Sequence, residues 1–142
     1  MFDHQDLLNA ISCASQESGL YWDGKSLPIF TQLQSAYIPN TGIQITNSGQ
    51  PVTNSDRAQG DYKWGPNELV VGQMADKPAL VHEATHYLQR MNGLFAGAPA
   101  SPQRQKIEAQ ARHSEYLAPY DCMGMFGDWN SGLLAKYQGQ KK

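Results

Sequence analysis

The chain is poor in charge and in cysteine. Charged residues make up 17% of its 142 residues, and 11 basic against 13 acidic side chains give a formal net charge of −2. This balance provides no basic surface for a nucleic acid or an anionic membrane, so we expect neither as a partner. Two cysteines are too few for a disulfide scaffold, and their wide separation lacks the spacing of a cysteine metal site. We expect Cys13 and Cys122 to be free buried thiols, with a single disulfide as the alternative in an oxidising environment.

The sequence also lacks a long apolar run. No stretch is long enough to cross a membrane, and residues 1–6 are acidic where a secretory signal would be basic. The default expectation is therefore a cytoplasmic protein. The length and the hydrophobic content of 40% are typical of a single globular domain, which we expect to span residues 1–142.

The most informative motif is His82-Glu83-Ala84-Thr85-His86, which contains two of the four histidines of the chain. Histidines four residues apart lie on one face of a helix, so both imidazoles can bind one metal ion. The intervening Glu83 can act on a metal-bound water without being a ligand. This pattern predicts a zinc hydrolase that cleaves peptide or protein substrates, with Glu83 as its general base.

The surrounding sequence predicts a helix near residues 77–92. Asp76 can cap its N-terminus, Pro78 is tolerated in its first turn, and Asn92-Gly93 favours a stop. At 100° per residue its apolar and polar side chains separate onto two faces. The apolar face comprises Leu80, Val81, Ala84, Tyr87, Leu88 and Met91, and the polar face comprises His82, Glu83, Thr85, His86, Gln89 and Arg90.

A catalytic zinc ion usually has three protein ligands. A second helix, predicted from Ser101-Pro102 to Ala118, offers Glu108, His113 and Glu115. We favour Glu108, which lies in the second turn, with Glu115 as the fallback ligand or as a residue that orients a histidine. The two glutamates are about 10 Å apart along the helix axis, so one ion does not bind both. His113 points more than about 100° away from their line.

Other segments predict a small sheet and further helices. Residues 68–72 form a compact apolar run typical of a strand, and residues 43–46 alternate like a short strand. Residues 4–18 predict an amphipathic helix, and residues 27–37 a short helix or strand. We expect residues 47–60 to form a surface loop and residues 131–138 another helix. Together these elements predict an α+β domain.

This order of a strand, an H-E-x-x-H helix, a loop and a Glu-bearing helix resembles the gluzincin metallopeptidases over roughly residues 67–118. The string from His82 to Gln89 also resembles small zincin-like domains of bacteria and their viruses. The resemblance implies a single zincin-like domain whose small mixed or antiparallel sheet packs on the two helices. It implies that His82, His86 and Glu108 bind Zn²⁺.

The resemblance also implies roles around the ion. The strand at residues 68–73 would pair with an extended substrate, through Leu69, Val70, Val71 and Gly72. Arg112 stands where thermolysin-like enzymes have an Asp that orients a histidine, so Asp121 or Asp128 would take that role. Candidates for stabilising the transition state are Tyr116, Tyr120, His113 and Arg112.

Three alternatives stay open at this stage. The first is a catalytically inert zincin-like protein whose metal serves a structural or interaction role. The second is an interaction module without metal. The third keeps the metal chemistry but cleaves another amide, such as one in peptidoglycan. The oligomeric state is not predicted.

Overall fold

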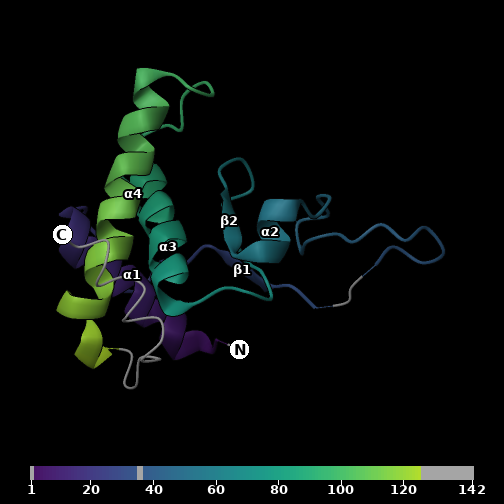
Figure 1. Cartoon of the computed structure of the whole chain (residues 1–142), viewed down its shortest axis with the longest axis horizontal. Helices are drawn as coiled ribbons and strands as arrows, with labels where there is room; N and C mark the ends of the chain where they lie inside the picture. The colour runs from purple at the N-terminus through teal and green to yellow at the C-terminus, as the bar shows by residue number, and fades with distance from the viewer. Residues whose placement is uncertain (1, 35–36, 126–142) are drawn as a thin grey trace.

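Three long helices form one layer of the fold. The computed structural model describes residues 2–34 and 37–125. Within them, α1 (His4–Ser18), α3 (Lys77–Met91) and α4 (Pro102–Asp121) pack against one another, and α3 also contacts the strands (Figure 1). A short 3₁₀ turn, Met123–Met125, follows α4.

Three short strands form a mixed sheet beside this helical layer. The strands are β1 (Ile29–Gln32), β2 (Gly60–Lys63) and β3 (Glu68–Val71), in the order β1-β3-β2. The strand β3 is parallel to β1 and antiparallel to β2. All four residues of β3 are buried, because strands cover both of its edges and α3 packs against it. The described part of the chain is thus a single α+β domain with a small mixed sheet, as predicted.

The core lies where the three helices and the sheet meet. Its buried apolar side chains come from every long element: Leu7, Ala10, Ile11, Cys13, Ala14, Tyr62, Leu69, Val71, Leu80, Val81, Ala84, Tyr87, Leu88, Ala118 and Cys122. Burial of this set removes its apolar surface from water, which is the main term that stabilises the fold.

Local sequence explains where the first and third helices begin and end. Asp3 and Asp6 form a capping box at the start of α1, and Gly19 ends it in the left-handed conformation with φ 75°. Asp76 accepts a hydrogen bond from the backbone N–H of Ala79 at 2.8 Å and so caps α3. Both helices agree with the sequence prediction to within one residue.

The fourth helix runs further than predicted. It was expected to end at Ala118, but it continues through Pro119 to Asp121. A proline inside a helix loses one backbone hydrogen bond. Here the last turn still closes, because the N–H of Cys122 donates to the carbonyl of Ala118 at 2.9 Å, and Pro119 is buried.

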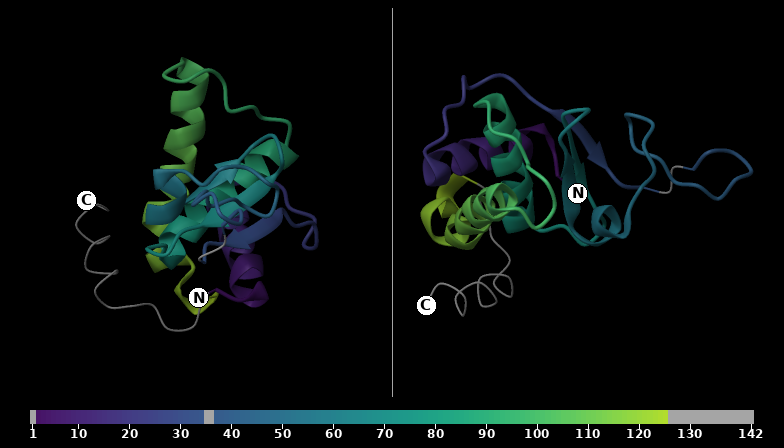
Figure 2. Two further views of the ribbon diagram at one scale, coloured as in Figure 1. Left: turned by 90° about the vertical axis from the view of Figure 1, so that its right-hand side faces the viewer. Right: turned by 90° about the horizontal axis from the view of Figure 1, so that it is seen from above.

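The region between α1 and β3 contains more structure than its polar composition predicts. The expected loop at residues 47–60 includes a short helix, α2 (Asn54–Ala58), which begins with a capping box between Thr53 and Asp56. The strand β2 was not predicted at all. Residues 27–37 contain the strand β1, whereas residues 43–46 form only isolated bridges within a loop that projects away from the helices (Figures 1 and 2).

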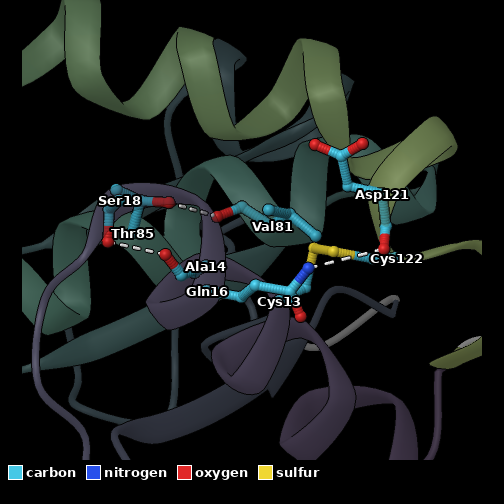
Figure 3. Close-up of a disulfide and its surroundings, with 8 residues drawn as sticks. All are labelled: Cys13, Ala14, Gln16, Ser18, Val81, Thr85, Asp121 and Cys122. Atoms are coloured by element: carbon cyan, nitrogen blue, oxygen red, sulfur yellow. Dashed lines mark hydrogen bonds between the residues drawn. A yellow bond between two sulfur atoms is a disulfide. The ribbon is translucent and has the colours of Figure 1, made fainter.

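The two cysteines form a disulfide, which corrects the expectation of free thiols. Cys13 of α1 and Cys122, directly after α4, have Cα atoms 5.8 Å apart (Figure 3). Beside them, Gln16 donates a hydrogen bond to the carbonyl of Asp121 at 3.5 Å. The bond therefore fixes the end of α4 to α1 and spans a sequence separation of 109 residues.

Within residues 2–34 and 37–125, no helix has the length and apolar character to span a bilayer. The predicted helix at 131–138 and the candidate Asp128 lie outside the residues that the structure describes.

Candidate metal centre

The polar face of α3 meets the first half of α4, and three predicted ligands come together there. Glu108 Oε1 lies 3.1 Å from His86 Nε2, and Glu108 Oε2 lies 3.4 Å from His82 Nε2. One ligand atom from each of the three side chains lies within 4.8 Å of the others. Ligands at the usual bond lengths around tetrahedral zinc are about 3.3 Å apart, so small side-chain movements would complete the site. The donor set of two imidazoles and a carboxylate fits Zn²⁺.

Glu115 lies two turns further along α4 and contacts the other side of the His82 ring. Its Oε1 is 2.7 Å from His82 Nδ1. The sequence left Glu115 open as a fallback ligand or an orienting residue. The structure places it where it holds the ring of His82 with Nε2 toward Glu108, an arrangement common for metal-binding histidines.

Glu83 is buried beside these side chains. Its side chain projects into the same cavity, with Oε1 3.8 Å from His82 Nε2, and the residue is only 9% exposed. Burial raises the pKa of Glu83 to about 7, although the charges of His82 and His86 oppose the rise. Among the described residues, no group forms a hydrogen bond with its Oε2. A carboxylate oxygen that is buried, basic near neutral pH and without a protein partner is suited to accept a proton from a bound molecule.

Hydrogen bonds between the predicted ligands shift the pKa values of His82 and Glu108. Burial lowers the pKa of His82, but hydrogen bonds to Glu108 and Glu115 outweigh this effect and raise it to about 10. Hydrogen bonds to His82 and His86 hold the pKa of Glu108 well below its usual range. A metal ion must therefore displace a proton from His82, so we expect its affinity to rise with pH.

An open cavity of about 400 Å³ gives access to these residues. Its walls come from α3, α4 and the segment from α2 to β2, and its lining residues are Ser55, Ala58, Gln59, Gly60, Asp61, Ala79, His82, Glu83, His86, Glu108 and Glu115. Among the described residues, this lining holds four carboxyl groups and two histidines but no lysine or arginine. The carboxyl groups favour a cation or a substrate without negative charge.

A buried ion pair supports the wall formed by α2 and β2. Lys63 Nζ lies 2.9 Å from Asp56 Oδ2 and 3.5 Å from Asp61 Oδ2. Asp56 is fully buried and also accepts a hydrogen bond from the N–H of Thr53 at 2.8 Å. This wall was not predicted from the sequence. The spacing of Thr53 and Asp56, typical of a capping box, is the signal that could have found α2.

The structure does not bring the other predicted side chains into the cavity. His113 and Arg112 are exposed on α4, and Tyr116 and Tyr120 are outside the lining. Asp121 lies at the far end of α4, where its carbonyl contacts Gln16. None of these five residues lines the cavity that contains His82, His86 and Glu108.

The residues predicted to bind the substrate backbone belong to a strand with no free edge, or directly follow it. Leu69, Val70 and Val71 belong to β3, whose backbone is paired on both sides by β1 and β2. Gly72 donates its N–H to the carbonyl of Gln59, and a Cβ at Gly72 would meet the carbonyl oxygen of Asp56 at 2.1 Å. The backbones of these residues are therefore already hydrogen-bonded within the fold. Of the described strands, β2 is the one with an unpaired edge whose residues line the cavity.

Two contacts to His86 were not foreseen. Its Nδ1 lies 2.8 Å from Gln89 Oε1, and its ring centroid lies 5.7 Å from that of Trp64. The sequence placed Gln89 on the polar face of the helix but gave no sign of its partner.

A comparison of the chain with models of protein families, with curated proteins and with solved structures found no match.

Proposed function

We propose that the protein is a zinc-dependent metallopeptidase of the zincin type, resembling the gluzincins. One observation supports this most strongly. The ligand atoms of His82, His86 and Glu108 converge beside a buried Glu83 whose Oε2 has no protein partner among the described residues. A structural metal site does not need a buried carboxylate that is unused by the fold.

In this proposal His82, His86 and Glu108 would hold the ion. Zinc bound there would act as a Lewis acid and would make water a nucleophile near neutral pH. Glu83 accepts the proton of the attacking water on its carboxylate and then gives it to the leaving amine of the peptide. Glu115 keeps His82 in its binding orientation through the 2.7 Å contact to Nδ1.

The unpaired edge of β2 is the proposed site for the substrate backbone, in place of β3. An extended peptide can add to an exposed strand edge through backbone hydrogen bonds. Gln59, Gly60 and Asp61 bring this edge to the cavity wall opposite α3. Because the cavity lining holds four carboxyl groups, we expect neutral and basic peptides to bind better than acidic ones.

The disulfide bears on where the protein works. Disulfides persist in oxidising compartments and are rare in the cytosol. The bond between Cys13 and Cys122 therefore favours an oxidising environment over the cytoplasmic default.

We expect a mixture of neutral and basic peptides to be cleaved by the zinc-loaded protein. Chelation should abolish cleavage, and addition of one equivalent of Zn²⁺ should restore it, because the ion would activate the water that attacks the peptide bond. Mass spectrometry of the products measures both results and identifies the cleaved bonds.

The alternative is a catalytically inert zincin-like protein with a structural or interaction role for its metal. It predicts that chelation lowers the melting temperature while no peptide is cleaved in either state. Cleavage that persists unchanged after complete removal of metal would contradict both candidates.

A further inference from the structure

Gln89 connects the two helices of the metal centre through a fully buried amide. It lies one turn after His86 in α3 and is 0% exposed. Its Oε1 lies 2.8 Å from His86 Nδ1, and its Nε2 donates to the carbonyl of Ile107 at 3.0 Å and to Gln110 Oε1 at 2.9 Å. Both Nε2 partners belong to α4, and they flank Glu108 in the sequence. One amide thus links a predicted ligand of α3 to the turn of α4 that carries another.

The hydrogen bonds determine the orientation of this amide. The carbonyl of Ile107 is only an acceptor, so the N–H₂ group of Gln89 must face it. A flipped amide would bring two oxygens together at about 3 Å in a buried position, which costs the hydrogen bond and adds repulsion. With both protons of its N–H₂ group directed to α4, Gln89 presents its Oε1 to His86.

The orientation of the amide determines the tautomer of His86. Because Gln89 Oε1 can only accept, His86 Nδ1 must carry the proton that it donates. A neutral imidazole with a proton on Nδ1 has its lone pair on Nε2. That nitrogen lies 3.1 Å from Glu108, on the side of the ring where the ligand atoms converge, so a metal ion bound there would replace the proton that Nε2 shares with Glu108.

From this chain of contacts we propose that Gln89 is a positioning residue that fixes His86 for metal binding through Nε2 and couples its orientation to the turn bearing Glu108. The inference rests on the proposed metal site. At Nδ1 of His86 the partner among the described residues is an amide held by α4, whereas at Nδ1 of His82 it is the carboxylate of Glu115.

The test separates the acceptor of Gln89 from its donors. Gln89→Leu removes all three hydrogen bonds at similar volume, whereas Gln89→Glu keeps an acceptor for His86 and removes the amide donors. Gln105→Leu is the matched control, because Gln105 is exposed on α4. For each variant, a competition titration measures the dissociation constant for Zn²⁺, and urea unfolding measures stability.

We expect Gln89→Leu to weaken zinc binding about 10- to 100-fold, the usual effect of removing a partner of a ligating histidine. Gln89→Glu should bind zinc within about threefold of the wild type even though it is less stable, since histidine–carboxylate pairs also orient ligands. Gln105→Leu should change neither quantity. A folded Gln89→Leu with wild-type zinc affinity, or a Gln89→Glu as weak as Gln89→Leu, would overturn the inference.

A second measurement serves if Gln89→Leu does not fold. Long-range ¹H–¹⁵N spectra of the zinc-loaded wild type should show His86 with a protonated Nδ1 and a metal-bound Nε2. Coordination through Nδ1 would overturn the inference. A wild type that binds no zinc at all would instead remove the proposed metal site itself, so the two failures are distinguishable.

Discussion

Replacing Glu83 with Gln is expected to lower kcat for peptide cleavage about 10²- to 10⁴-fold, the range for loss of a general base. Gln has nearly the same shape but cannot accept the proton of water. Because Glu83 is not among the three converging ligands, the variant should still bind one equivalent of zinc. Steady-state cleavage of the best peptide and a zinc titration on the same sample measure the two effects.

The matched control for this variant is Glu17→Gln, a carboxylate of α1 outside the cavity. It should leave kcat and zinc affinity unchanged. A Glu83→Gln protein that cleaves peptide at the wild-type rate would exclude Glu83 from the chemistry. Loss of zinc together with activity would instead mean that Glu83 serves the metal site structurally.

Removing the disulfide is expected to lower the free energy of unfolding by about 2–5 kcal/mol. The bond closes a loop with a sequence separation of 109 residues, and the chain-entropy argument gives a large effect for so long a loop. Both sulfurs are buried, so reduction should proceed through opening of the structure. Urea unfolding of Cys13→Ala/Cys122→Ala against the oxidised wild type measures the difference.

The free energy of unfolding of this double variant should not change when a reducing agent is added, because the variant has no disulfide to reduce. The bond joins α1 to the end of α4, whereas Glu108 lies near the beginning of α4, so zinc affinity should fall little while the variant remains folded. An unchanged free energy of unfolding would contradict the stabilising role assigned to the bond.

The parts of the centre that the sequence predicts depend on local signals. The helix with His82 and His86 is determined by its cap, its first-turn proline and its periodicity, all within one segment. Glu108 was favoured over Glu115 because it lies nearer the returning loop, and the structure brings Glu108 to both imidazoles and Glu115 to the far side of His82.

The features that the sequence did not predict depend on contacts between segments that are far apart in the chain. The order of strands in the sheet is not the order in the chain, so β3 was taken for an edge when β2 is the strand beside the cavity. The pairing of Cys13 with Cys122 requires α1 and α4 to be adjacent, which no spacing reveals. The partner of His86 was missed because the orientation of Gln89 is determined by backbone on another helix.

The predicted polar face of α3 illustrates the same limit. The periodicity separates a polar face that was predicted to carry the metal ligands, but it does not show that another helix covers this face: Thr85, His86 and Gln89 are buried, and only Arg90 of the polar face is exposed. The helix α4 packs on that face and converts it into an interface. Polar side chains inside such an interface need partners, and the metal ligands and their hydrogen bonds provide them.

The proposed metal centre is tested by a zinc titration of the purified protein, monitored by equilibrium competition, with Glu108→Gln and Glu115→Gln in parallel. The proposed centre predicts one site per chain in the wild type. It predicts a loss of about 10- to 100-fold in affinity for Glu115→Gln, which only releases His82, and a larger loss for Glu108→Gln, which removes a ligand. A wild type that binds no zinc, or a Glu108→Gln protein with wild-type affinity, would contradict the proposed metal centre.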